Sequence, residues 1–262
     1  MPTPPIALTI AGSDSGGGAG IQADLKTFHH FRVFGTSAIT AITAQNTRGV
    51  QGWIAVPVAM IESQIDAVAG DLRPAATKTG MLADASIVVA VAAAVRRHAL
   101  APLVVDPVMV SASGDALLER DAVIALRERL IPLATLVTPN LDEAEILVGE
   151  TVRDVEAMER VGRLLVARGA TAALIKGGHL IGDAAIDVLV HGDRVRVFTH
   201  PRLDTRHTHG TGCTLSSAIT ALLALGNKLE SAVEQSIDWV HRAIASAPAL
   251  GGGHGPLNHW AE

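Results

Sequence analysis

The most reactive side chain in this sequence lies in a glycine-bracketed run, HTHGTGCTLSS (207–217), that holds the chain's only cysteine, Cys213. Apolar residues recur behind this cysteine at helical spacing, at Leu215, Ile219 and Leu222. Cys213 is therefore expected in the first turn of a helix, where the backbone N–H groups of residues 210–213 point at a ligand oxygen. The run predicts an anion-binding site, or, as the plainer alternative, a glycine turn that caps a buried helix.

The thiol itself admits more than one chemistry. A helix N-terminus can lower a thiol pKa from about 8.5 towards neutrality, and Cys213 would then accept a proton from a substrate hydroxyl. With His207 or His209 as its base, the same thiol would be the nucleophile of a hydrolase. The His-x-His pair also suggests a metal, but two histidines without a third ligand nearby are too few. Proton acceptor and nucleophile both remain open from these residues.

A second glycine loop, GSDSGGGAG (12–20), leads into a predicted helix over 21–31 and could also hold an anion. It matches a dinucleotide fingerprint only loosely, because no acidic residue occurs between Asp24 and Glu62. The nucleotide P-loop is excluded, since the chain has no Gly-Lys dipeptide. If this protein binds ATP, it does so without either motif.

Short apolar strands alternate with helical periods along the chain, which predicts an α/β fold with a mostly parallel, doubly wound sheet. The segment 187–198 carries a turn at His191-Gly192-Asp193 between alternating residues and predicts a small hairpin. No linker, repeat or low-complexity run interrupts the pattern, so we expect one domain over residues 1–262.

The predicted strands end in polar or glycine-rich residues. In a doubly wound sheet, ligands bind beyond the carboxyl ends of the strands, so these ends predict one shared site. They are Gly12-Ser13-Asp14, Gln45-Asn46, Gly80-Met81, Asp106-Pro107, Pro139-Asn140 and Lys176-Gly177-Gly178.

Composition narrows the class of partner. The net charge is −5, tyrosine is absent, and only seven residues are Trp or Phe, which argues against nucleic acid as a ligand. No apolar stretch reaches the roughly 20 residues that a membrane helix requires. The N-terminus lacks the basic region of a signal peptide, and we expect a cytoplasmic protein that does not bind membranes.

Eight segments together resemble the bacterial hydroxymethylpyrimidine and phosphomethylpyrimidine kinases of the ribokinase-like superfamily. They are GSDSGGGAGIQADLKTF (12–28), TAITAQNT (40–47), KTGML (78–82), VVDPVMVS (104–111), TPNLDEAEIL (138–147), IKGGH (175–179), HTHGTGCTLSSAI (207–219) and GHGPLNH (253–259). The resemblance implies a three-layer α/β/α fold and a homodimer. It also implies ATP-dependent, Mg²⁺-assisted phosphorylation of 4-amino-5-hydroxymethyl-2-methylpyrimidine, and then of its monophosphate, in thiamine biosynthesis.

Carried over residue by residue, the resemblance implies a pyrimidine site formed by Gly12, Asp24, Gln45, Met81 and Val108. The chemistry agrees, because a carboxylate or amide can hydrogen-bond an aminopyrimidine edge while Met and Val pack the ring. The plainer alternatives are a solvated helix carboxylate for Asp24 and ordinary core roles for Met81 and Val108.

The resemblance also implies the residues that handle the phosphate. Asn140 and Glu143 match the superfamily's Asn-x-x-Glu motif at the nucleotide, and Asp106 and Glu143 are implied at Mg²⁺, which needs few carboxylates. Lys176 is one of only four lysines and could follow a phosphate during transfer. The implied catalytic group is Gly210, Thr211, Gly212, Cys213 and Lys176, of which Thr211 and Lys176 are also expected to contact ATP. The superfamily commonly has Asp where this chain has Cys213.

Three other functions remain to be weighed. A pyridoxal or pyridoxine kinase of the same superfamily would use the same glycine-cysteine loop. A thiol hydrolase would need no ATP. A vitamin or nucleotide sensor could keep the fold alone, but Lys176, Asn140 and Glu143 are all present, and a sensor has no need of them.

Overall fold

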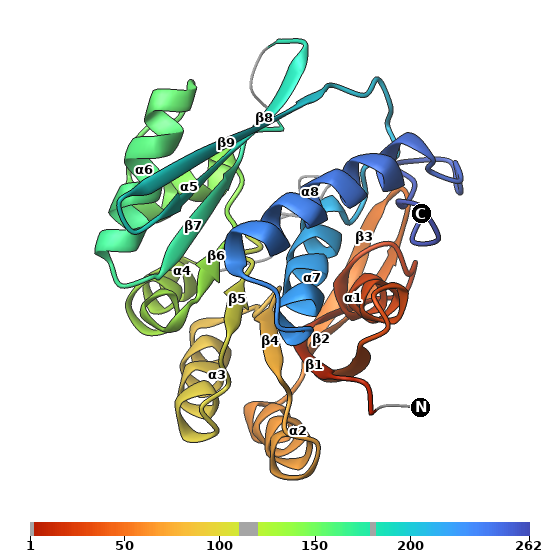
Figure 1. Ribbon diagram of the computed structural model, residues 1–262. Helices are drawn as coiled ribbons and strands as arrows, with labels where there is room; N and C mark the ends of the chain where they lie inside the picture. The colour runs from red at the N-terminus through yellow and green to blue at the C-terminus, as the bar shows by residue number, and fades with distance from the viewer. Residues whose placement is uncertain (1–2, 110–119, 179–181) are drawn as a thin grey trace.

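The strands of this protein form one nine-stranded sheet in the computed structural model, which describes residues 3–109, 120–178 and 182–262 (Figure 1). The order across the sheet is β3-β2-β1-β4-β5-β6-β7-β8-β9. Neighbours from β2 to β7 are parallel, whereas β3, β8 and β9 are antiparallel at the two edges. The strands are β1 (Ile6–Asp14), β2 (Phe34–Asn46), β3 (Gly49–Ala55), β4 (Ala76–Thr79), β5 (Leu103–Val105), β6 (Leu136–Val137), β7 (Ala172–Lys176), β8 (Ala184–His191) and β9 (Arg194–Pro201). The predicted mostly parallel α/β sheet is confirmed.

Helices cover both faces of the sheet and make three layers (Figure 1). One layer holds α2 (Val58–Asp71), α3 (Ala85–Arg97), α4 (Arg120–Ala125), α5 (Leu141–Val148) and α6 (Val155–Ala167). The other holds α1 (Gly20–His30), α7 (Thr211–Ala224) and α8 (Leu229–Ala245). Among the described residues, no helix is both long and apolar enough to cross a bilayer.

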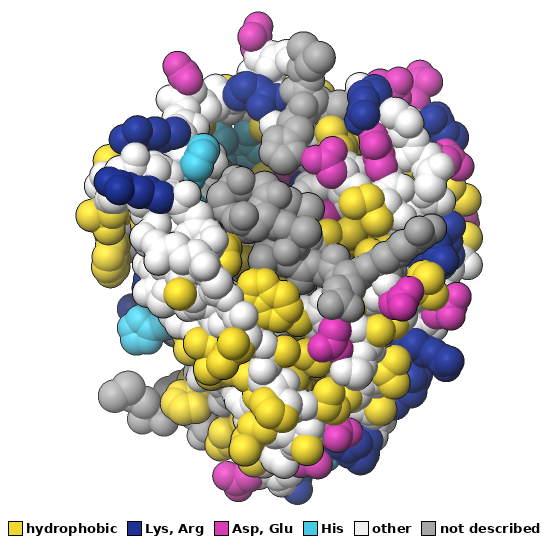
Figure 2. All heavy atoms as spheres, turned by 180° about the vertical axis from the view of Figure 1, so that it is seen from behind, with side chains coloured by type: hydrophobic (Ala, Val, Ile, Leu, Met, Phe, Trp, Pro, Cys, Tyr) yellow, Lys and Arg dark blue, Asp and Glu magenta, His cyan; other side chains and the backbone are white. Residues whose placement is uncertain are grey.

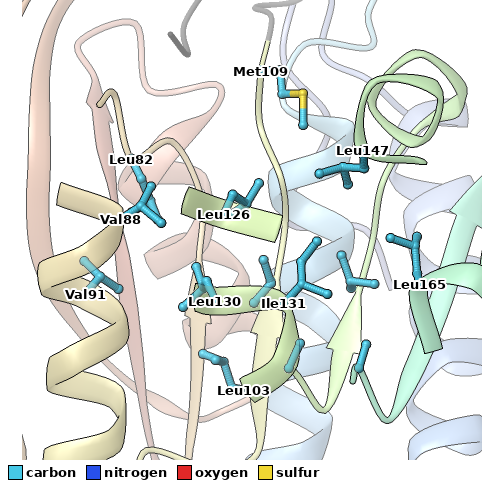
Figure 3. Packing of buried hydrophobic residues seen from close by; sticks show 14 of the residues in the cluster. Leu82, Val88, Val91, Leu103, Met109, Leu126, Leu130, Ile131, Leu147 and Leu165 are labelled. Carbon is cyan, nitrogen blue, oxygen red and sulfur yellow. The ribbon is translucent and has the colours of Figure 1, made fainter. Parts of the chain in front are cut away.

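Alternating side chains of the central strands pack against the two helical layers, because successive residues of a strand point to opposite faces. Leu103 and Val105 belong to the core beneath α2 to α6, and the intervening Val104 belongs to the core beneath α7 and α8. Figure 3 shows the first of these cores, where Leu103 lies close to Leu130. This packing on both faces holds the strands in place, and with them the polar residues at the strand ends.

Three local features differ from the sequence-based predictions. No strand is predicted at β3, because two of its seven residues are glycine and most of its side chains are exposed; pairing with β2 forms it. The predicted hairpin at 187–198 is confirmed but extends over β8 and β9. After α4 the chain continues as a π-helical segment, Leu126–Leu130, which the apolar pattern does not predict.

The chain changes direction across the sheet at β1, which has β2 on one side and β4 on the other. In a doubly wound sheet, this switch point opens a crevice at the carboxyl ends of the strands. The first glycine loop leaves β1 at that place, so the topology brings the predicted site residues of β1, β2 and β4 to one edge.

Candidate functional site

The two glycine loops pack directly against each other at this edge. Gly210 caps the N-terminus of α7 with φ +83°, a conformation that favours glycine. A Cβ atom there would lie 1.9 Å from the carbonyl oxygen of Gly18. The start of α7 is therefore seated on the loop that follows β1, and no larger residue than glycine fits at position 210.

The first turn of α7 has backbone donors to spare. Thr214 donates its N–H to the Gly210 carbonyl, and Thr211 donates to Thr208. Among the described residues, the N–H groups of Gly212 and Cys213 have no hydrogen-bond acceptor. Unpaired donors at a helix N-terminus favour an anion, which fits the predicted hole.

A lysine and a carboxylate lie next to these donors. Lys176 Nζ is 3.0 Å from Asp106 Oδ1, and a Cβ on Gly212 would lie 3.2 Å from the same Nζ. Burial opposes the charge on each partner, but the pair keeps the pKa of Lys176 above and that of Asp106 below its ordinary value. Both groups are therefore charged, and the ammonium lies beside the start of α7.

Asn140 and Glu143 form a capping box at the start of α5. The Asn140 side chain accepts from the Glu143 N–H, and Glu143 Oε2 accepts from the Asn140 N–H at 2.8 Å. Burial raises the pKa of Glu143 to about 7, although Lys176 opposes this shift. The backbone of Asn140 also pairs with that of Lys176, which joins this box to the Lys176–Asp106 pair.

Asp106 and Glu143 are the carboxylates at this edge that could bind a magnesium ion. Asp106 accepts from Lys176 and Thr138 on Oδ1 and from Ser216 on Oδ2, so its lone pairs are largely used. Glu143 retains free lone pairs beside its backbone bonds. Within the described chain, no three His, Cys, Asp or Glu side chains are grouped as a metal cage. Mg²⁺ keeps several waters and needs one or two carboxylates, so this sparse set fits a hydrated ion held partly by phosphate.

The remaining residues predicted around the pyrimidine lie at the ends of β1, β2, β4 and β5. A Cβ on Gly12 would lie 3.3 Å from the Met81 sulfur, so these two residues are in contact. Gln45 is half-buried at the end of β2, and Val108 is half-buried just beyond Asp106. Three further motif residues, Val110, Ser111 and His179, lie outside the described residues.

Asp24 needs a correction. Its side chain is fully buried, and its carboxylate accepts from Lys78 Nζ at 2.8 Å, from Thr9 Oγ1 at 2.6 Å and from Ser217. A direct hydrogen bond from Asp24 to a substrate, as predicted, does not fit this arrangement, because both oxygens are already bonded and shielded. Asp24 instead balances the buried charge of Lys78 beneath α7.

The prediction for the thiol also needs a correction. Burial raises the pKa of Cys213 to about 12, against the opposing effects of Lys78 and the Gly20 N–H, and Asp24 adds to the rise. The helix N-terminus therefore does not bring this thiol towards neutrality. Cys213 is protonated at pH 7 in the unliganded protein.

Alkylation of the single cysteine tests this state. We expect the rate of Cys213 alkylation by iodoacetamide, followed by mass spectrometry, to rise about tenfold per pH unit from pH 7 to 9.5, because only the thiolate reacts. Free cysteine, whose rate levels off above its pKa of about 8.5, is the reference. A plateau below pH 9 in the protein would contradict a burial-raised pKa.

Three residues at this edge, Asp14, Lys78 and His209, make contacts that the sequence motifs do not indicate. Lys78 is fully buried at a strand end, and its signal was a lysine inside the apolar segment AATKTGM. His209 Nε2 is 2.9 Å from Asp14 Oδ2 and therefore is engaged with a carboxylate. That contact also weakens the hydrolase alternative, which needs this histidine as the base of the thiol.

The model of the phosphomethylpyrimidine kinase family matches residues 14–258. This chain belongs to that family. A Bacillus subtilis (strain 168) relative named hydroxymethylpyrimidine/phosphomethylpyrimidine kinase is 48% identical, over 97% of this chain and 94% of the relative.

Solved structures of similar proteins agree with this family assignment. The phosphomethylpyrimidine kinase of Clostridium difficile 630 superposes with a TM-score of 0.83 at 44% identity, covering 92% of this chain and 99% of the other. An ADP complex of Bacillus subtilis pyridoxal kinase gives a TM-score of 0.92 at 38% identity, covering 99% and 98%. The ribokinase-like fold is therefore shared by two kinds of kinase, and only the site can separate them.

Proposed function

We propose that this member of the phosphomethylpyrimidine kinase family transfers the γ-phosphoryl group of ATP to 4-amino-5-hydroxymethyl-2-methylpyrimidine, and then to its monophosphate, in thiamine biosynthesis. The observation that carries the proposal is the charged Lys176 beside the free N–H groups of Gly212 and Cys213. The near-full-length relatives with that name support the choice of substrate.

The transferring phosphoryl group carries negative charge on its outer oxygens, so positioning and electrostatics supply most of the catalysis. Gly212 and Cys213 would donate their N–H groups to these oxygens from the start of α7, with Gly210 and Thr211 setting the turn. Lys176 would follow the phosphate as a compact positive charge. These groups are fixed before the ligand arrives, because Asp106 holds the lysine and Gly18 seats the turn.

Mg²⁺ would be held by Glu143 and Asp106 through its waters, with Asn140 fixing the carboxylate of Glu143. Bound there, it neutralises phosphate charge and aligns the transferred group. Thr211 and Lys176 complete the proposed contacts with ATP.

The hydroxymethyl proton is where Cys213 would act, once the thiol has lost its own proton. Lys78 favours that loss and burial opposes it. We expect Cys213→Ala to slow phosphorylation of the alcohol at least tenfold more than that of the monophosphate, because the phosphate is already ionised near neutral pH. Both kcat/KM values are measured on purified substrates. Equal fractional losses would exclude the thiol as the proton acceptor.

A pyridoxal kinase is the second candidate, because the structure of one superposes closely on this chain. The deciding experiment supplies ATP with the hydroxymethylpyrimidine and, in parallel, with pyridoxal, and separates mono- from diphosphate products. We expect the pyrimidine diphosphate to accumulate and kcat/KM for pyridoxal to be at least tenfold lower. Preferential phosphorylation of pyridoxal would overturn the proposed function.

We further propose that the protein is a homodimer. Ile42 and Ile54 are paired across β2 and β3 and are 50% and 65% exposed, and Trp53 on β3 and Met60 on α2 are also exposed. Figure 2 shows hydrophobic side chains gathered over the lower part of the molecule as seen from behind. An exposed apolar pair at a sheet edge favours burial against a second copy.

The oligomeric state is tested by sedimentation. We expect the wild-type protein to sediment as a dimer, and Ile54→Arg as a monomer, since a desolvated charge opposes association. Ile146→Arg, an exposed position on α5, is the matched control. A dimer that persists in Ile54→Arg would place the interface elsewhere.

The cytoplasmic location stays part of this proposal, because ATP and a reduced thiol both suit that compartment.

A further inference from the structure

A buried hydrogen bond between His209 and Asp14 joins the two glycine loops. The side chains of His209 and Asp14 are 9% and 3% exposed, and their Nε2 and Oδ2 atoms are 2.9 Å apart. The same carboxylate accepts backbone N–H groups from Gly16 at 2.8 Å, Gly18 at 3.0 Å and Ala19 at 2.8 Å. Asp14 therefore holds the loop after β1 through backbone hydrogen bonds. It also contacts His209, the residue immediately before the N-cap of α7.

The histidine ring has little room to move. The N–H of His209 donates to the Gly255 carbonyl, and the backbone of His209 pairs with that of Pro256 in the C-terminal segment. A Cβ atom on Gly18 would lie 2.5 Å from the ring carbon Cδ2. The ring is packed against the first glycine loop, and the C-terminal segment holds its backbone.

Proton counting fixes the state of this pair. Burial of Asp14 opposes its charge, but His209 and the N–H groups of Ala19 and Gly16 outweigh burial and hold the pKa of Asp14 below its usual value. The ionised carboxylate can only accept hydrogen bonds, so Nε2 of His209 carries the proton.

The same proton faces the amide of Gln45. The side-chain nitrogen of Gln45 is 3.5 Å from His209 Nε2, which sets two donors against each other. Thr43 donates its hydroxyl proton to the Ser13 carbonyl at 2.8 Å, which leaves the Gln45 oxygen, at 3.2 Å, facing the lone pairs of the Thr43 hydroxyl. A half-turn of the amide removes both conflicts, because the nitrogen then donates to Thr43, and the oxygen shares the single Nε2 proton of His209 with Asp14 as the longer branch of the bond.

We propose that His209, held by Asp14, is a positioning residue that fixes the Gln45 amide with its oxygen towards His209 and its nitrogen towards Thr43. The amide then presents a fixed acceptor and a fixed donor to the site. That pattern matches a ring edge that carries an amine beside an unsaturated nitrogen, and it fits poorly to an edge that carries a hydroxyl. The inference deepens the proposed function and rests on it, because it assigns the choice of aminopyrimidine to the Asp14–His209 pair.

A double-mutant cycle between His209 and Gln45 tests the inference. We expect His209→Phe to raise KM for the hydroxymethylpyrimidine about tenfold while KM for ATP changes less than twofold. In the Gln45→Ala background, the same substitution should lower kcat/KM less than twofold further, since the residue through which it acts is gone. His209→Gln, which keeps a donor towards Asp14, should recover most of the loss.

Controls separate orientation from folding. His254→Phe, at an exposed histidine that contacts the Arg206 carbonyl nearby, should leave both KM values unchanged. If His209→Phe does not fold, His209→Asn takes its place in the cycle, because its shorter side chain loses the contact with Gln45. Equal losses in the presence and absence of the Gln45 amide, or a parallel rise in KM for ATP, overturn the inference alone. A wild-type protein that does not phosphorylate the pyrimidine overturns the proposed function and the inference with it.

Discussion

Gly212→Val is expected to lower kcat for both phosphorylations by about 1,000-fold or more, which corresponds to about 4 kcal/mol of lost transition-state stabilisation. A Cβ atom at this position lies 3.2 Å from Lys176 Nζ and 3.6 Å from Asp106 Oδ2. The two methyl groups of valine reach further and would displace the lysine, the first turn of α7, or both. Backbone donors and the ammonium would then no longer meet the same phosphate.

The measurement is single-turnover transfer from ATP to each substrate, with circular dichroism to show that the variant is folded. Gly70→Val is the matched control, because a Cβ at Gly70 on α2 meets nothing within 4 Å. It should keep its activity within about twofold. A folded Gly212→Val enzyme that keeps more than a tenth of both activities would contradict the proposed anion site.

Lys78→Met is expected to lower the free energy of unfolding by about 3–5 kcal/mol, because it leaves the carboxylate of Asp24 buried without its counter-charge. Both side chains are fully buried, so water cannot replace the missing ammonium. The second substitution in Lys78→Met/Asp24→Asn should recover much of the loss, since asparagine removes the charge and keeps one carbonyl oxygen that accepts from Thr9 or from Ser217.

Urea unfolding at pH 7 measures this difference. Lys228→Met, at an exposed lysine before α8, is the control and should change stability by less than about 0.5 kcal/mol. If the single variant is as stable as the double variant, the Asp24–Lys78 pair does not carry the buried charge balance beneath α7. Asp24 would then not be needed to balance the charge of Lys78.

These two variants separate the surface of the site from its support. Gly212 lies where the phosphate would bind, whereas Lys78 is fully buried, and the carboxylates of Asp24 and Asp106 both stabilise its charge against the effect of burial. Loss of activity without loss of stability is therefore expected for the first variant. Loss of stability, with activity following it, is expected for the second.

The polar strand ends can be predicted from the sequence, because each follows a short apolar segment. A parallel α/β sheet then brings them to one edge. The period of the apolar residues behind Cys213 also placed the start of α7 within two residues. The strand β3 is not predictable in this way, because its glycines and exposed side chains show no periodic pattern. It forms through pairing with β2. Edge strands of this kind form because a neighbouring strand pairs with them, and local residue propensity does not reveal that pairing.

The α/β architecture, the glycine loops and the family can all be predicted from the amino-acid sequence, because they depend on local patterns and motifs. The environment of the buried ionisable groups at the site, in contrast, follows from the tertiary structure alone. The pKa of Cys213, the pairing of Asp24 with Lys78 and the contact of His209 with Asp14 all arise between segments far apart in the chain. Charge states follow from burial and from the nearest opposite charge, and folding creates both.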